Sequence, residues 1–453
     1  MRTSRSRNII LALCFMGALF LGVLVAPQHF TPSNSTAQMI QAQISPATPP
    51  AIAAEAALDP APQSAAPQPA VPQPAAAQPA ATQPAATQPA TTQQSANPQA
   101  ATKQAATTYR AIDEQYRDRF GIASNEVLAP SSLPNTALRF NERDLLTVLQ
   151  NTQAYFQAYS TENPDIQRTG ILGTQGVTVA NVLDTLSFMI STLQEDISNG
   201  RPIRLKDPVF VNANFRVIRW SAYNPEDPQE TLVRLTKYAV FTHPGSRTRT
   251  ATYNVPLYQL REDAEGDRFY LNITKQQVLS GIYESGGSLQ GRVDPLVYLT
   301  RESFEDAIMQ GTILIKYADG TSAYFNVDRN NGIVYVPGID PYQQRRYWYF
   351  RPVDNIQGYG HQFEKKIAIK PGVTFAGDVL NIGLGRMVVL EHSTTGQREL
   401  KLGVIADTGG AFLPNLHQLD YLAGVFGDRN EFYNAIRSLP EYSKAYFLVR
   451  KSN

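Results

Sequence analysis

Two aspartates near the C-terminal end carry the most informative chemistry in this chain. Asp407 follows the apolar run Leu402–Ala406 and precedes a turn formed by Gly409 and Gly410, and Asp420 lies between two apolar residues. Apolar runs of this kind place a carboxylate at the end of a rigid strand. A carboxyl group with apolar neighbours has a raised pKa, which a general acid at neutral pH needs. The pair is therefore a candidate acid–base site.

Each aspartate also has a simpler interpretation. Turn aspartates accept hydrogen bonds from nearby amides, and Asp407 is placed to accept those of Gly409 and Gly410. That role is compatible with support of Asp420 by Asp407. A purely structural carboxylate is the alternative for Asp420. His417 is close enough in sequence to donate a hydrogen bond to Asp420, or it is a solvated loop residue.

The rest of the sequence offers no other catalytic set. It has neither a P-loop nor a Gly-x-Ser-x-Gly turn for a serine nucleophile, and Gly383-Leu384-Gly385 lacks the rest of a dinucleotide fingerprint. No two histidines are spaced as metal ligands on one element. We therefore expect no cofactor and no metal ion. The histidines are His29, His243, His361, His392 and His417.

Two helices are predicted ahead of the strands that must position the aspartates. Asn141 is typical of a helix N-cap, and apolar residues at helical spacing predict a helix over Glu142–Tyr159. A second helix is predicted after Thr178. Both helices carry one apolar side, so we expect them to pack on something larger.

From residue 210 onward the apolar pattern changes to the period of short strands. Predicted strands include Phe210–Trp220, Gly332–Val336 and Tyr347–Phe350, and Gly-containing turns such as Asp319-Gly320 separate them. Many short strands with regular turns favour a barrel or a sandwich over alternating strands and helices. The aromatic run 347–349 is interpreted as core, with sugar stacking as the alternative.

The aspartate stretch resembles the MltA family of membrane-bound lytic murein transglycosylases, whose C-terminal part is the 3D domain. The resemblance extends from about Asn214 to Lys451. Its most specific part is similar to the family's Asp-Val-Gly-Gly-Ala, Phe-Asp and spaced glycines, which here are Asp407-Thr408-Gly409-Gly410-Ala411, Leu419-Asp420, Gly424 and Gly427. A second part is similar to the family's Gln-Gly segment, Asp-Gly turn and Asn-Gly-x-x-Tyr, which here are Phe304–Gly311, Asp319-Gly320 and Asn331-Gly332-x-x-Tyr335.

The resemblance implies a fold that is mainly β with accessory N-terminal helices. It implies a double-psi β-barrel interrupted by a smaller inserted β domain, with the glycan in the groove between them. The corresponding boundaries are 109–255 for the helices and first part of the barrel, 256–345 for the inserted domain, and 346–453 for the second part of the barrel.

The resemblance also implies roles for individual residues. Ordinary glycosidases use two carboxylates, whereas a lytic transglycosylase takes its nucleophile from the substrate, because muramic acid O6 attacks its own C1. Asp420 falls on the family's catalytic aspartate and would act as general acid and then base. Asp407 falls on a supporting aspartate. The residues implied in substrate binding are Gln310, Gly311, Asn331, Gly332, Tyr335, Tyr238, Gly409 and Gly410.

Two alternatives stay open. The first is a non-catalytic protein of the cell envelope that keeps the same fold to bind peptidoglycan or act as a scaffold. Two departures from the family pattern favour it: Gln310-Gly311 is followed by Thr312-Ile313, and Thr236-Lys237-Tyr238 only loosely matches a Thr-Gly-Tyr-Tyr segment. The second alternative is hydrolysis by the two aspartates with water.

The N-terminal residues predict export. Arg2, Arg5 and Arg7 precede the uncharged apolar run Ile9–Ala26, which fits a membrane anchor or a signal segment over 1–30. We favour an uncleaved anchor in the inner membrane with the rest on the periplasmic side; a secreted protein is the alternative if the segment is cleaved. Residues 31–108 contain a tract rich in Ala, Pro and Gln that predicts a disordered tether.

Composition limits the partners. The net charge is +1 with no long basic run beyond the N-terminal flank, which argues against nucleic acid. The single cysteine, Cys14, lies within the apolar run, so the exported part has no intramolecular disulfide and depends on its core. We expect peptidoglycan glycan strands and the membrane as partners.

Overall fold

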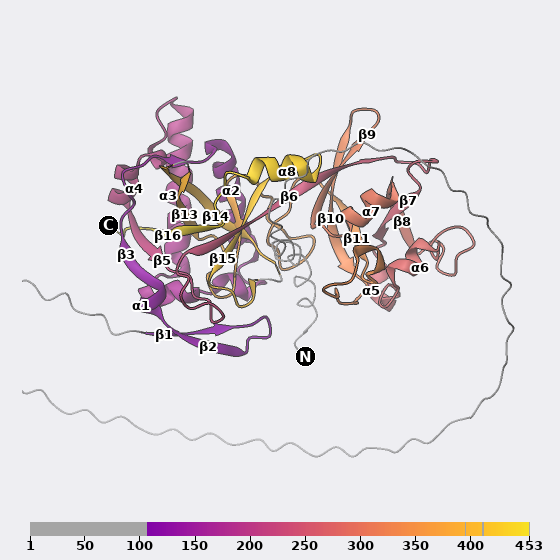
Figure 1. The fold of residues 1–453 in the computed structure, drawn as a ribbon, viewed down its shortest axis with the longest axis horizontal. Coiled ribbons are helices and arrows are strands. Elements are labelled where there is room, and N and C mark those ends of the chain that lie inside the picture. The colour runs from indigo at the N-terminus through magenta and orange to yellow at the C-terminus, as the bar shows by residue number, and fades with distance from the viewer. Residues whose placement is uncertain (1–106, 395, 410–411, 453) are drawn as a thin grey trace, which may run out of the picture. The chain divides into compact units, whose positions relative to one another are not determined.

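The computed structural model describes residues 107–394, 396–409 and 412–452, all of which belong to one compact unit. The expected anchor, residues 31–106 of the expected tether, and Gly410 lie outside the described residues. Strands predominate, with a few helices, as Figure 1 shows. This agrees with the mainly β class predicted from the sequence.

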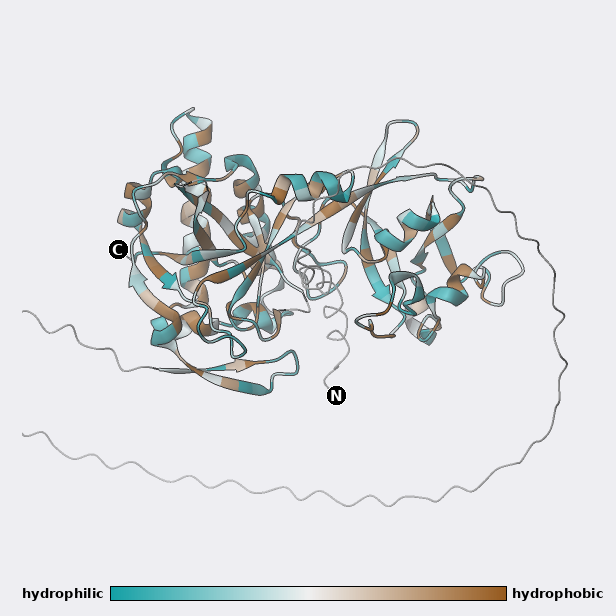
Figure 2. Cartoon of the chain, viewed as in Figure 1, coloured by the Kyte–Doolittle hydropathy of each residue, from teal (hydrophilic) through white to brown (hydrophobic). Residues whose placement is uncertain are grey.

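The N-terminal part contains most of the longer helices. Asn141 caps α2 through its side chain, and Thr178 forms a capping box with Asn181 at the start of α3, so both predicted helices are confirmed. Figure 2 shows hydrophobic and hydrophilic residues alternating along these helices. The elements are β1 (Thr108–Ile112), β2 (Asp118–Ala123), β3 (Leu128–Ser131), β4 (Leu138–Arg139), α1 (Ser124–Val127), α2 (Glu142–Tyr159), α3 (Val179–Ser198) and α4 (Pro208–Asn214).

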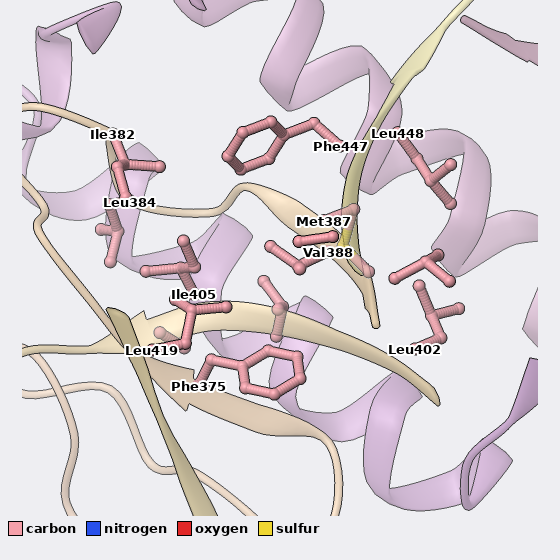
Figure 3. Packing of buried hydrophobic residues seen from close by; sticks show 14 of the residues in the cluster. Phe375, Ile382, Leu384, Met387, Val388, Leu402, Ile405, Leu419, Phe447 and Leu448 are labelled. Carbon is pink, nitrogen blue, oxygen red and sulfur yellow. The ribbon is translucent and has the colours of Figure 1, made fainter. Parts of the chain in front are cut away.

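A ring of hydrogen-bonded strands follows. In the described part of the chain, β6, β15, β12, β14, β13 and β16 pair in this order, and β16 pairs again with β6, so the path returns to its start. Apolar side chains from β12, β13, β14, β15 and β16 pack against one another in the core (Figure 3). The elements are β5 (Phe215–Trp220), β6 (Val233–Gly245), β12 (Thr374–Ala376), β13 (Met387–Thr394), β14 (Gln397–Asp407), β15 (Gln418–Phe426), α8 (Arg429–Ile436) and β16 (Tyr442–Arg450).

A second hydrophobic core lies between β6 and β12 in the sequence, and its residues run from Leu257 to Phe350. Tyr347, Trp348 and Tyr349 are buried in it, which confirms their interpretation as core. The far end of β6 pairs with β9 and so joins this part to the ring. The elements are β7 (Val255–Leu260), α5 (Ala264–Asp267), α6 (Lys275–Leu279), β8 (Val293–Leu299), α7 (Arg301–Ala307), β9 (Thr312–Tyr317), β10 (Ser322–Asn330) and β11 (Trp348–Val353).

Several predicted strands, among them the following two, are wrong in part or in full. Residues 210–214 belong to helix α4, which Asp207 caps and Pro208 begins, and only 215–220 form a strand. Residues 332–336 form no strand. The backbone N–H and C=O of Val336 bond the buried side chain of Gln344 instead of a neighbouring strand.

Two surveys concern the described residues only. No single helix among them is long and apolar enough to cross a membrane; the bent pair Pro164–Gln175 and Val179–Ser198 meets that test by length and composition alone. No group of three His, Cys, Asp or Glu side chains in the same ranges is arranged to hold a metal ion.

Candidate active site

The described residues form a cavity with a volume of about 910 Å³. Strand β6 lines it from Arg234 to Pro244, and residues of α7, α8 and the segment 356–363 contribute further walls. Asp407 and Asp420 both line this cavity. The structure therefore brings the two predicted acidic residues to one concave site, where ligand sites in proteins usually form.

Strand pairing brings the two aspartates level with each other. Ala376 on β12 is the Cα partner of Asp420 on β15 and of Asp407 on β14. Two strand spacings therefore separate the two aspartate Cα atoms, which corresponds to about 10 Å. The register on β14 passes from Ile405 directly to Asp407, so Ala406 is an extra, bulged residue. The bulge re-aims Asp407 and places it opposite Ala376.

Asp420 is a buried carboxyl group with little support from donors. Its side chain is 6% exposed, and no described residue gives Oδ1 a hydrogen-bond partner. Burial raises the pKa of Asp420 to about 7, and the charge of Asp407 adds to this rise. A group with this pKa is protonated about half of the time at neutral pH, which suits a proton donor.

Thr236 is the polar neighbour of Asp420 on β6, where it is the Cα partner of Asp420. Its hydroxyl lowers the pKa of Asp420 when it points to the carboxylate. The same hydroxyl lies 3.1 Å from the carbonyl oxygen of Leu419 and accepts a hydrogen bond from Gln418. Because the hydroxyl has one proton, it serves either the carbonyl or the carboxylate, and it cannot hold Asp420 permanently ionised.

Asp407 has firm partners on both oxygens. The Tyr238 hydroxyl donates to Oδ2 at 2.6 Å, and the Thr408 amide donates to Oδ1 at 2.8 Å. Burial raises the pKa of Asp407 to about 6, while these two donors and the charge of Lys366 lower it. The predicted hydrogen bonds from the Gly409 and Gly410 amides remain a prediction, since Gly410 lies outside the described residues and the observed amide donor is that of Thr408.

A lysine that sequence reasoning missed faces the same cavity. Lys366 lines it, and Nζ donates to Asn326 Oδ1 at 2.5 Å. Burial lowers the pKa of Lys366 to about 8, and the charges of Asp407 and Asp328 oppose this fall. A half-buried ammonium group near Asp407 favours the ionised form of that carboxylate. The partners of Lys366 lie far away in the chain, so no local sequence pattern marks it.

The two carboxyl groups are therefore unequal. Asp407 has two hydrogen-bond donors and a nearby cation, whereas Asp420 has an unpartnered oxygen within the described residues and a negative neighbour. When the pair holds one proton, these surroundings favour the proton on Asp420 and the ionised form of Asp407, although the charge of Lys237 lowers the pKa of Asp420. This is the division of labour that a single general acid beside a supporting carboxylate requires.

Asp378 is another buried aspartate, which sequence reasoning missed. It is fully buried, and its oxygens accept the amides of Leu380, Asn381 and Asn415 and the side-chain amide of Asn381. It therefore fixes the start of the segment that leads into β15 and Asp420. The available signal was weaker than for Asp407, because Asp378 follows only the short segment Val373-Thr374-Phe375-Ala376-Gly377.

The predicted Gln-Gly segment reaches the cavity. Gln310 and Gly311 both line it. The Gln310 Oε1 accepts the Phe241 amide at 3.0 Å, and Nε2 lies 3.0 Å from Nε2 of His243. Burial lowers the pKa of His243 to about 4, so the ring is neutral and accepts this hydrogen bond. Gln310 thus connects β6 to the segment that follows α7.

The other predicted substrate-binding residues divide into two groups. Tyr238 lines the cavity and donates a hydrogen bond to Asp407. Gly409 is not part of the described lining, but it follows Thr408, which is. Asn331, Gly332 and Tyr335 are absent from its described lining. The Asn331 side chain is buried and donates to the carbonyls of Ile273 and Arg345. Sugar contact by either group remains a prediction.

Comparisons with known proteins give structural neighbours only. No family model and no curated protein matches the sequence. Solved structures that match are a membrane-bound lytic murein transglycosylase from Agrobacterium tumefaciens (TM-score 0.47, 16% identity, 72% of this chain and 98% of that chain), Escherichia coli MltA with bound chitohexaose (0.46, 17%, 72% and 95%) and MltA from Neisseria gonorrhoeae (0.44, 15%, 72% and 98%). They are structures of the family that the aspartate motifs resemble. Similarity of this degree assigns no activity to this chain.

Proposed function

We propose that this chain is a peptidoglycan lytic transglycosylase. It cleaves the β-1,4 bond between N-acetylmuramic acid and N-acetylglucosamine and forms a 1,6-anhydromuramoyl end. The observation that carries the proposal is the unequal pair in the cavity: Asp420 is poised to donate a proton, and both oxygens of Asp407 are already engaged.

One proton-transfer residue is sufficient for this reaction. Protonated Asp420 gives its proton to the glycosidic oxygen as the bond from C1 to that oxygen breaks. The muramic acid O6 then bonds to C1 and its hydroxyl proton passes to the Asp420 carboxylate, which restores the starting form. Ionised Asp407 keeps the proton on Asp420 and stabilises positive charge that develops at C1.

The surroundings of Asp407 disfavour the hydrolytic alternative. A nucleophilic carboxylate, or one that activates water, needs an oxygen that faces the sugar freely. Tyr238 and the Thr408 amide each hold one oxygen of Asp407. The substrate's own O6 then supplies the nucleophile.

The same proposal extends to the fold and the location. We infer that the closed strand ring is a double-psi β-barrel, that 256–345 is the inserted domain, and that 109–255 and 346–453 form the barrel. The separate core from Leu257 to Phe350 supports an insertion and extends it past the boundary at 345 to Phe350. The enzyme would work in the cell envelope, on the periplasmic side, held to the inner membrane by its N-terminal segment.

Purified sacculi provide the test. The wild-type chain should release 1,6-anhydro muropeptides, detected by mass spectrometry, and Asp420→Asn should release none. Asp407→Asn should keep a reduced activity, because it supports the acid and does not replace it. If the wild type binds sacculi and releases nothing, the chain is a peptidoglycan-binding protein and the proposal is wrong.

A further inference from the structure

A group of aromatic side chains forms one wall of the cavity at a distance from the aspartates. We define the α8 wall as Phe241 on β6 with Phe432 and Tyr433 on α8, all of which line the cavity. The ring centroids of Phe241 and Phe432 are 5.8 Å apart, and those of Phe432 and Tyr433 are 5.6 Å apart. Figure 1 shows α8 beside β6.

All three residues of the α8 wall are at least partly exposed. None of the residues of α8, all of which are described, is buried, and Tyr433 is 50% exposed. An amphipathic helix normally buries its apolar side in a core. Here the aromatic side chains of α8 face the cavity instead, so they are available to a ligand.

Polar contacts hold α8 in place over the cavity. Asp428 caps the helix by accepting the Glu431 amide, and the Glu431 carboxylate accepts the Gly427 amide at 2.6 Å. Arg429 donates to Asp306 on α7 at 2.9 Å. The aromatic rings are therefore presented on a fixed element, which reduces the entropy lost on binding.

The strand register gives the distance from the wall to the acid. On the paired strands, Asp420 lies opposite Thr236 and Phe426 lies opposite Phe241. Thr236 and Phe241 are five residue steps apart on β6, which corresponds to about 16 Å along the strand. A sugar ring at Asp420 cannot reach the α8 wall, so only a longer chain can contact both.

We propose that the α8 wall is a remote subsite that stacks a pyranose ring of the glycan strand. This inference rests on the proposed function, because it assumes that the glycan runs through the cavity from Asp420. A pyranose ring has an apolar C–H face and polar hydroxyl groups at its edge. Half-exposed aromatic rings with one phenolic hydroxyl match that combination, since they offer an apolar face and a polar handle.

The test measures binding separately from cleavage. The full chain carrying Asp420→Asn is titrated calorimetrically with a hexamer of β-1,4-linked N-acetylglucosamine. Adding Tyr433→Ala should weaken hexamer binding about tenfold, the loss typical of truncating an aromatic anchor. Adding Tyr433→Phe should retain most of the affinity, because the ring remains. The matched control is Tyr342→Ala, since Tyr342 is 48% exposed and outside the cavity lining.

Each outcome decides the proposal. Weaker binding with Tyr433→Ala, and unchanged binding with Tyr342→Ala, supports it. Equal binding by Tyr433→Ala and its parent overturns it, and so does a parent that does not bind the hexamer. If hexamer binding depends on Tyr433 while the wild type releases no anhydro products from sacculi, the proposed enzyme activity fails and the α8 wall stands as a glycan site.

Discussion

The hydrogen bond from Tyr238 to Asp407 offers a quantitative test of the unequal pair. Tyr238→Phe removes the hydroxyl that donates to Asp407 Oδ2 at 2.6 Å and leaves the ring in place. A hydrogen bond to a charged group contributes about 1.5–3 kcal/mol, which corresponds to a rise of about one to two units in the pKa of Asp407.

The consequence follows from where the single proton resides. The donors to Asp407 and the charge of Lys366 favour its ionised form, so the single proton resides mainly on Asp420. In Tyr238→Phe the ratio of molecules protonated on Asp420 to those protonated on Asp407 falls about ten- to hundredfold. We expect kcat/KM near pH 6.5 to fall about two- to tenfold, and the acid limb of the pH profile to move to higher pH.

The assay is the initial rate of anhydro muropeptide release from sacculi between pH 5 and pH 8. The matched control is Tyr421→Phe, because Tyr421 neighbours Asp420 and its hydroxyl accepts from Lys401 at 2.9 Å, outside the cavity lining. An unchanged profile in Tyr238→Phe would refute the reasoning. An equal loss in Tyr421→Phe would attribute the effect to the loss of a buried hydroxyl in general.

Three further predictions concern the other charged groups. The folded pKa of Asp420, about 7, exceeds its unfolded value, so the free energy of unfolding falls as pH rises from about 4 to about 7. Asp420→Asn should therefore be more stable than wild type at pH 8, by at most about 4 kcal/mol. Urea titrations should show this difference shrinking at pH 4. Lys366→Met should raise the pKa of Asp407 and move the acid limb of the rate profile to higher pH, while Lys366→Arg should keep the acid limb near that of wild type. Identical profiles for the two variants would show that the charge of Lys366 does not affect Asp407. Asp378→Ala leaves buried amide donors unpaired, so its urea midpoint should fall by the equivalent of at least about 2 kcal/mol, and an unchanged midpoint would show that these hydrogen bonds are not needed.

Local signals explain which elements were predictable. Helix α2 begins after Asn141 and α3 after Thr178, because capping depends on residues within one turn. The same local chemistry, Asp207 followed by Pro208, marks helix α4, and the strand prediction for 210–214 overlooked it. Residues 332–336 have the composition of a strand, but a strand also needs a partner, and pairing is not a local property.

The site shows the same division. Sequence spacing placed Asp407 and Asp420 near one another, and the structure confirms that both line one cavity. Their alignment depends on β12, which lies between them in the sheet but precedes both in the chain, and on the extra residue Ala406. The partners Tyr238 and Lys366 come from elements far away in the sequence. The positions that nonlocal pairing decides are therefore those that the sequence left open.

Isotope incorporation tests directly whether the oxygen that attacks C1 comes from the substrate or from water. Sacculi are digested with the wild-type chain in water enriched in ¹⁸O, and the released muropeptides are analysed by mass spectrometry. We expect 1,6-anhydromuramoyl ends without ¹⁸O, because the substrate's O6 attacks C1. Reducing ends that each carry one ¹⁸O atom would contradict it, since water would then be the nucleophile.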